Sequence, residues 1–174
     1  DVATGSLGQG ICAAVGIALN ARRIRSDYRT YALLGDGEMA EGSVWEAANL
    51  AQLYGLDNLC AIVDVNGLGQ SRATQFDHNM AEIERRWNAF GWHAIVVDGH
   101  DIKALLDAFE SARTTKGRPT AIVARTIKGK GIKAIEGKDG WHGKALKKGE
   151  ETDKAIAELQ AQLGPEDGPV RIAS

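Results

Sequence analysis

The fold is decided by residues 31–68, whose sequence is YALLGDGEMAEGSVWEAANLAQLYGLDNLCAIVDVNGL. An apolar strand and an acidic loop flanked by glycines come first, a helix follows, and a second apolar strand ends in an asparagine loop. Asp36 in the first loop and Asn66 in the second are separated by about the length of one strand-helix-strand unit. Both side chains are therefore expected at one edge of a parallel sheet, which is where such sheets bind ligands.

The alternation of helices and strands continues on both sides of this stretch. The expected helices are 7–23, 41–54, 80–90, 102–114 and 150–163, and the expected strands are 31–34, 59–65, 93–97 and 119–124. Helices between strands imply right-handed crossovers and a parallel sheet covered on both faces. The fold class is α/β, a parallel sheet flanked by helices. Residues 1–150 are expected to form a partial diphosphate- and metal-binding domain, and 151–174 a terminal amphipathic helix with a linker-like tail.

Composition narrows the function classes. With 174 residues, 44% hydrophobic and 25% charged, the chain has the make-up of one ordinary soluble domain. A net charge of −2 provides no basic field for nucleic acid. No run of about 18 apolar residues and no leader is present, so no membrane partner and a cytoplasmic location are expected. Cys12 and Cys60, which form no CxxC motif, are expected to be buried thiols in a reducing compartment. The first residue is not methionine, which suggests an excised or processed piece.

The two loops carry groups that suit a metal and a diphosphate. Mg²⁺ prefers oxygen ligands and often shares its shell with phosphates, so Asp36, Asn66 and a backbone carbonyl are suitable. Glycines on both sides of Asp36 let the main chain approach a diphosphate, and the amides that open the next helix can receive its charge. An isolated GDG triplet would be only a turn, but Asn66 at the end of the next strand makes the pair informative. No P-loop motif is present, and no strand precedes the glycines at 5–10, so a dinucleotide fingerprint is weak.

Several collinear motifs closely resemble the transketolase family. These motifs are TGSLGQG (4–10), LGDGE (34–38), EGSVWEA (41–47), LDNL (56–59), LGQS (68–71), FGW (90–92), VDGHD (97–101), TIKGKGI (126–132) and WHGK (141–144). The resemblance runs from about residue 4 to 146 and covers the later part of that family's diphosphate-binding domain. It is closer to the animal-type branch than to the yeast-type one.

The resemblance implies an activity and its cofactors. Transketolases use thiamine diphosphate with Mg²⁺, for which Ca²⁺ can substitute, to move a two-carbon ketol unit from a ketose phosphate to an aldose phosphate. The implied setting is a dimer in the pentose phosphate pathway that acts on sugar phosphates. By motif position, the resemblance places Mg²⁺ on Asp36, on the side chain of Asn66 and on the carbonyl of Leu68.

The resemblance also assigns residues to the cofactor and to catalysis. The implied cofactor-binding residues are Gly5, Ser6, Leu7, Gly37, Asn66, Gln70, Lys128 and His142. His142 would also help to move the proton of the donor hydroxyl, and Glu41 and Glu46 would belong to a proton-relay network between two active sites. The alternatives are a solvated loop lysine, a structural histidine and a solvated helix start. His78, His93 and His100 are interpreted as structural.

Part of the family's active site has no counterpart in this sequence. The family activates thiamine through a glutamate on a separate pyrimidine-binding domain of the partner subunit, so a homo-oligomer or a complementary chain is expected. The isolated chain should not be active. The alternatives are a noncatalytic remnant that binds Mg²⁺ and diphosphate, or part of another thiamine diphosphate enzyme, such as a deoxyxylulose phosphate synthase or a 2-oxo acid dehydrogenase component.

Overall fold

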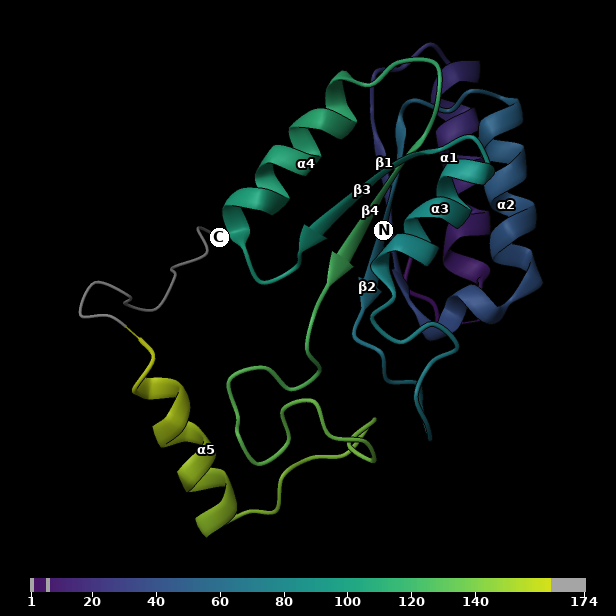
Figure 1. Ribbon diagram of the computed structural model, residues 1–174. Coiled ribbons are helices and arrows are strands. Elements are labelled where there is room, and N and C mark those ends of the chain that lie inside the picture. Colours follow the sequence, from purple (N-terminus) through teal and green to yellow (C-terminus); the bar gives the residue numbers. More distant parts are fainter. Residues whose placement is uncertain (1, 6, 164–174) are drawn as a thin grey trace.

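The computed structural model describes residues 2–5 and 7–163 (Figure 1). Its elements are α1 (Gln9–Arg23), β1 (Thr30–Gly35), a short 3-10 helix η1 (Gly37–Ala40), α2 (Gly42–Leu53), β2 (Leu59–Val65), α3 (Met80–Ala89), β3 (His93–Asp98), α4 (Ile102–Thr114), β4 (Thr120–Arg125) and α5 (Glu150–Gln160). Each expected helix and strand is present, with small differences at the ends, and the α/β class is confirmed. The short helix η1 was not expected. It forms where the Asp36 side chain accepts a hydrogen bond from the Gly37 N–H and so caps the turn.

The four strands form one parallel sheet in the order β1-β2-β4-β3. Gly35 of β1 pairs with Asp64 of β2, Val65 of β2 pairs with Arg125 of β4, and Asp98 of β3 also pairs with Arg125, so the four strands end at nearly the same level. The loops that follow β1, β2 and β4 are therefore neighbours. The loop after β3 follows the edge strand on the other side of β4. Strand order thus decides which of the four glycine-containing loops can share a site.

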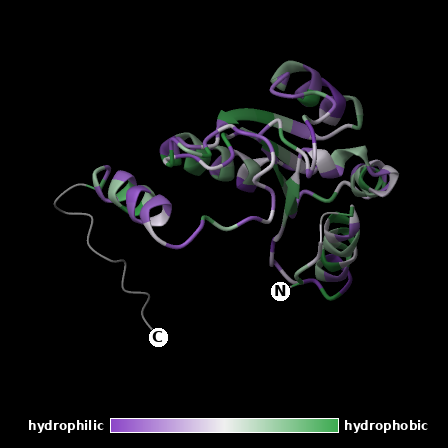
Figure 2. Ribbon diagram, turned by 90° about the horizontal axis from the view of Figure 1, so that it is seen from below, coloured by the Kyte–Doolittle hydropathy of each residue, from purple (hydrophilic) through white to green (hydrophobic). Residues whose placement is uncertain are grey.

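One face of the sheet carries α1, α2 and α3 over the larger core (Figure 1). Small residues of α1 and α2 face inward, which lets the two helices and the sheet approach closely. An aromatic cluster closes this core: Trp87 and Trp92 are fully buried, with ring centroids 4.8 Å apart, and Trp45 packs on Trp87 and Phe90. Figure 2 shows the hydrophobic strands between helices that carry many hydrophilic residues.

The opposite face is covered by α4 over a smaller cluster that includes Cys60 and Ile122. The helix does not reach all of β1. Leu33 remains 75% exposed, and Tyr31 is exposed apart from an edge-on contact with Phe109. The expectation that helices cover both faces therefore holds fully for one face only.

The expectation of two buried thiols was half wrong. Cys60 is completely buried in β2, but Cys12 is exposed on α1, where its thiol lies 3.1 Å from the carbonyl oxygen of Gly8. Position 12 falls on the helix face that points away from the sheet, and an apolar neighbourhood in sequence does not determine which face of a helix a residue occupies.

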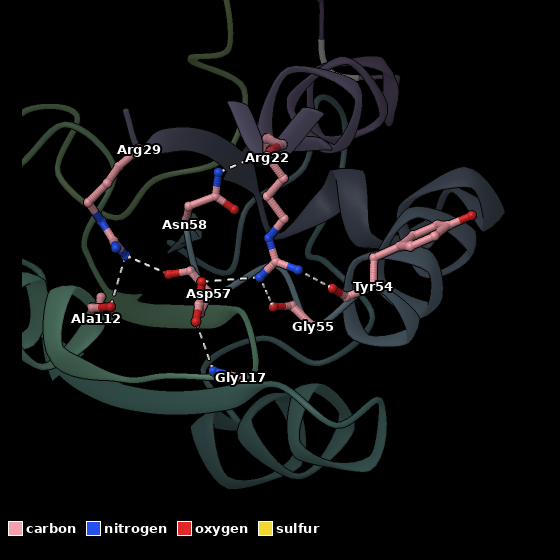
Figure 3. Close-up of polar contacts among 9 residues, drawn as sticks. Arg22, Arg29, Tyr54, Gly55, Asp57, Asn58, Ala112 and Gly117 are labelled. Atoms are coloured by element: carbon pink, nitrogen blue, oxygen red, sulfur yellow. Dashed lines mark hydrogen bonds and ion pairs between the residues drawn. The ribbon is translucent and has the colours of Figure 1, made fainter. Parts of the chain in front are cut away.

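A polar network ties elements together at the amino edge of the sheet (Figure 3). Arg22 at the end of α1 donates to the carbonyls of Tyr54 and Gly55 and pairs with Asp57 at 3.2 Å. Asp57 also accepts a 2.9 Å hydrogen bond from the Gly117 N–H. In the same network, Arg29 donates to the carbonyls of Asp57 and Ala112, and Asn58 donates to that of Ala18. The network joins the ends of α1, α2 and α4 to the start of β2.

Residues 126–149 form a long loop below the carboxyl edge, and α5 lies beside it (Figure 1). Side chains of and just beyond α5 contact this loop: Glu158 accepts from the Lys133 N–H, and Gln162 donates to the Gly131 carbonyl. None of the helices in the described part of the chain is long and apolar enough to span a lipid bilayer.

Candidate functional site

A cavity of about 1000 Å³ opens at the carboxyl edge of the sheet. Its walls are the loop after β1, the loop after β2 and parts of the loop after β4, and Leu7 adds to them from the segment before α1. The lining includes Asp36, Gly37, Glu41, Asn66, Leu68, Gln70, Lys128 and His142. These eight sequence-predicted residues thus come together from widely separated segments. The loop after β3 does not line the cavity, which is consistent with the position of β3 on the other side of β4 from β1 and β2.

Asp36 joins the two glycine loops. It is buried, and its Oδ1 accepts from the Gly37 N–H at 2.9 Å. Its Oδ2 accepts from the Gly67 N–H at 2.8 Å and from the Thr74 hydroxyl at 2.9 Å. The pKa of Asp36 lies above its usual value. Burial is the main cause, the charge of Asp64 acts in the same direction, and the three hydrogen bonds oppose the shift without cancelling it. A carboxylate in this position would be stabilised by a nearby cation.

Asn66 and Leu68 continue the same surface. The Oδ1 of Asn66 accepts from the Leu68 N–H at 3.0 Å, and its Nδ2 donates to Oδ2 of Asp64 at 2.9 Å. The three predicted metal ligands therefore lie close together, because Asp36 is hydrogen-bonded to Gly67, the residue between Asn66 and Leu68. No group of three or more His, Cys, Asp or Glu side chains in residues 2–5 and 7–163 is placed to hold a metal ion. The predicted set differs in composition, because it has one carboxylate, one amide oxygen and one carbonyl.

The predicted phosphate-lining residues lie beside Asp36. Leu7 lines the main cavity, and Gly5 lines a smaller hollow next to it. Ser6 is outside the described residues. Glu38, which belongs to the predicted loop motif but was given no role of its own, holds this segment in place: it is buried, and its carboxylate accepts from the N–H groups of Gly8 at 2.9 Å and Gly35 at 3.3 Å. The segment before α1 is thereby fastened to the end of β1.

Lys128 and His142 form a polar pair on another wall. The Nζ of Lys128 lies 3.2 Å from Nδ1 of His142 and 3.4 Å from the carbonyl oxygen of Leu68. Lys128 is half-buried, which does not fit a freely solvated loop lysine. The long loop thus brings one cation and one imidazole to the loop that follows β2.

Glu41 and Glu46 are placed differently. Glu41 precedes α2 and lines the cavity, whereas Glu46 is exposed on α2 and does not line it. The three histidines interpreted as structural all make fold contacts: His78 Nε2 lies 2.9 Å from the Thr126 carbonyl oxygen, His93 lies near Ser111, and His100 accepts from the Ile127 N–H.

Sequence reasoning also missed Asp64, Thr74 and Thr126. Asp64 accepts from Asn66 and from the hydroxyl of Thr126, which follows β4. The position of Asp64, two residues before Asn66 in an otherwise apolar strand, was a usable signal, because strand alternation puts both side chains on one face. Nothing local in the sequence marks Thr74 or Thr126.

A parallel sheet with a polar cavity at its carboxyl edge, walled by glycine loops around a buried aspartate, defines an α/β domain of the cofactor-binding class. Comparison with known proteins identifies the family. Residues 1–173 match the family model described as transketolase, thiamine diphosphate binding domain. The chain belongs to this family.

The relatives include animal proteins. The chain is 51% identical over 164 residues to transketolase from Homo sapiens, covering 94% of this chain and 26% of that protein. It is 52% identical to transketolase-like protein 2 from Mus musculus, covering 85% of this chain and 24% of that protein. The predicted resemblance is confirmed, and the chain spans only about a quarter of these relatives.

Solved structures agree with the fold. A transketolase from Campylobacter jejuni superposes with a TM-score of 0.72 at 34% identity, covering 78% of this chain and 22% of that one. A Pichia stipitis transketolase mutant in complex with fructose 6-phosphate gives 0.70 at 36% identity, covering 77% and 21%.

Proposed function

We propose that this chain supplies the diphosphate- and metal-binding part of a thiamine diphosphate-dependent transketolase. The reaction is transfer of a two-carbon ketol unit from a ketose phosphate to an aldose phosphate. The observation that carries the proposal is the meeting of Asp36, Asn66 and Leu68 in one cavity, in a chain of this family. The fructose 6-phosphate complex of the Pichia stipitis relative supports sugar phosphates as substrates.

The cavity suits the diphosphate of the cofactor with a divalent cation. The carboxylate of Asp36, Oδ1 of Asn66 and the carbonyl of Leu68 would hold Mg²⁺ or, in its place, Ca²⁺, since both prefer oxygen ligands. Gly5, Ser6, Leu7 and Gly37 would line the phosphate and thiazolium end, and Gln70 would border the thiamine. Gly37 offers an open approach, because a Cβ there would meet nothing closer than 3.6 Å.

Bound thiamine diphosphate supplies the carbanion chemistry of ketol transfer. The residues of this chain provide charge and proton handling. The ammonium of Lys128 would offset the negative charge of the diphosphate. Its hydrogen bond to Nδ1 of His142 leaves the imidazole proton on Nε2, where it can be exchanged with a hydroxyl of the sugar.

The remaining proposed roles need a second subunit. Glu46 is exposed on α2 and Glu41 lies at the helix start, which suits a hydrogen-bonded relay that crosses a subunit interface. The pyrimidine-binding domain would come from the partner in a dimer or from a complementary chain. We place the complete enzyme in the cytoplasm and the pentose phosphate pathway.

Two alternative functions, another thiamine diphosphate enzyme and a noncatalytic remnant, can be distinguished from the proposed one. Identity of about 50% to proteins named transketolase favours this enzyme over a deoxyxylulose phosphate synthase or a 2-oxo acid dehydrogenase component. A noncatalytic remnant would bind Mg²⁺ and diphosphate without turnover. The retention of Asp36, Glu41, Asn66 and His142 together argues against a remnant, since binding alone does not require all four.

Two measurements test the proposal. Ketol transfer from a ketose phosphate to ribose 5-phosphate is expected only when this chain, a chain carrying the pyrimidine-binding domain, thiamine diphosphate and Mg²⁺ are all present. Calorimetry of the complete assembly should show that Asp36→Ala abolishes Mg²⁺-dependent cofactor binding. The matched control is Asp139→Ala, since Asp139 is an exposed aspartate that also accepts from the next glycine N–H. No turnover in any combination would refute the enzyme, and unchanged affinity in Asp36→Ala would refute the metal assignment.

A further inference from the structure

Asp64 lines the cavity of the candidate site, next to the predicted ligands. It is the last residue but one of β2, two residues before Asn66, and is half-buried. One carboxylate oxygen, Oδ2, accepts from Nδ2 of Asn66 at 2.9 Å, and the other, Oδ1, accepts from the hydroxyl of Thr126. Both oxygens are therefore occupied by neutral donors from within the fold.

The contact with Asp64 determines which way the Asn66 amide points. A carboxylate only accepts hydrogen bonds, so it selects the NH₂ end of the amide. On the other side, the N–H of Leu68 donates to Oδ1 of Asn66 at 3.0 Å and selects the oxygen end. A flipped amide would place oxygen against carboxylate and NH₂ against N–H, and both contacts would be lost.

Amide orientation matters because an amide oxygen binds a divalent cation and an amide NH₂ group does not. We propose that Asp64 is a positioning residue that holds the Asn66 side chain with its oxygen toward the cation site. This inference rests on the proposed function, since it assigns a task to Asn66 there. Asp64 acts only through its neighbour and is not itself placed among the cation ligands.

The neighbouring strand holds Asp64 in turn. Thr126 follows β4, and its backbone N–H donates to the Val65 carbonyl at 2.9 Å, which extends the pairing of β2 with β4. The imidazole of His78 hydrogen-bonds to the Thr126 carbonyl oxygen at 2.9 Å. These contacts fix the backbone of Thr126. Its hydroxyl then holds Asp64 in place, and Asp64 orients the amide of Asn66.

A purely structural role for Asp64 predicts different behaviour. In that case, Asp64→Ala would lower stability, and cation affinity would fall only as far as unfolding requires. The positioning role predicts a specific rescue. In the double variant Asp64→Asn with Asn66→Asp, the new amide donates to the new carboxylate and accepts from Thr126, while the carboxylate still offers oxygen to the cation. The hydrogen bond is kept with its direction reversed, and the net charge is unchanged.

The first measurement needs no ligand. Proton–nitrogen NMR of the complete chain follows hydrogen exchange of the Asn66 side-chain NH₂ group. This group should exchange more slowly than the side-chain NH₂ of the exposed Asn49, and the protection should be lost in Asp64→Ala, which removes both acceptor oxygens. Exchange as fast as that of Asn49 in the wild-type chain would overturn the proposal, whatever the cation result.

The second measurement follows Mn²⁺ binding by electron paramagnetic resonance in the presence of thiamine diphosphate. Loss of a partner that orients a ligand typically weakens metal binding by about 10- to 100-fold, and we expect this loss for Asp64→Ala and recovery in the double variant. Asp98→Ala is the matched control, because Asp98 ends β3 and accepts from the His100 N–H. A double variant no better than Asp64→Ala would overturn the positioning role. Absence of binding in the wild type, assayed together with a chain that carries the pyrimidine-binding domain, would refute the proposed function, and the exchange measurement would still decide the orientation.

Discussion

The amino-edge network makes Asp57→Ala a sensitive test of how this fold is held together. Asp57 lies just before β2, and its side chain is 27% exposed. It accepts from the Gly117 N–H at 2.9 Å and pairs with Arg22 at 3.2 Å (Figure 3). Removing the carboxylate leaves the Gly117 N–H without this acceptor and breaks the link between α1 and the loop after α4.

The magnitude follows from these two contacts. A hydrogen bond to a charged group contributes about 1.5–3 kcal/mol. The ion pair adds less than about 1 kcal/mol, because the Arg22 side chain is 42% exposed and solvent screens it. Arg22 also keeps its bonds to the carbonyls of Tyr54 and Gly55. We expect the free energy of unfolding to fall by about 2–3 kcal/mol, and Tm to fall by about 4–12 °C for a chain of this size.

Urea denaturation at pH 7 measures the loss. Asp57→Asn should fall between the wild type and Asp57→Ala, since its amide oxygen can still accept from Gly117. The control is Asp107→Ala, which removes an exposed i,i+4 pair with Lys103 on α4 and should cost less than about 0.5 kcal/mol. If Asp57→Ala loses no more stability than Asp107→Ala, the reasoning is wrong.

The pH dependence supplies a second check on Asp57. Burial raises the pKa of this carboxyl, but the Gly117 N–H, the hydrogen bond and charge of Arg22, and the charge of Lys116 together bring it below the ordinary value. A depressed folded-state pKa means that the contribution is complete above the unfolded pKa of about 3.9 and is lost as pH falls through the folded pKa. The stability difference between wild type and Asp57→Asn should therefore be constant from about pH 5 to 8 and shrink below about pH 4.

Two further predictions concern the site loop and the thiols. Gly67 has φ of +73°, so Gly67→Ala should lower stability by about 1–2 kcal/mol in urea denaturation, and a neutral effect would mean that this backbone is not left-handed in solution. In thiol titration of the folded chain, Cys12 should react quickly, whereas Cys60 should react only on unfolding, because it is fully buried and burial raises its pKa to about 12. Two fast thiols, or none, would contradict the structure.

Much of the fold could be predicted from local pattern. Apolar strands and small-residue helices have periodicities that are visible in sequence, so β2 and α4 were predicted with the bounds that the structure has. The order of the strands could not be predicted in this way, because it depends on pairings between distant segments. The exposed position of Cys12 was missed for a related reason, since the helix face it occupies is set by packing.

The amino-acid sequence alone predicted the chemical groups of the candidate site: an aspartate between glycines, an asparagine one strand-helix-strand unit later, and a lysine and histidine in a late loop, together with the family that these motifs indicate. Which of these groups lie together depends on the order of the strands in the sheet. Placing β4 beside β2 brings Thr126 and Lys128 to the Asn66 loop and leaves the loop after β3 outside the cavity. The hydrogen bonds from the Gly8 N–H to Glu38 and from the Thr126 hydroxyl to Asp64 could not be predicted from sequence, because each joins segments that meet only in the folded chain.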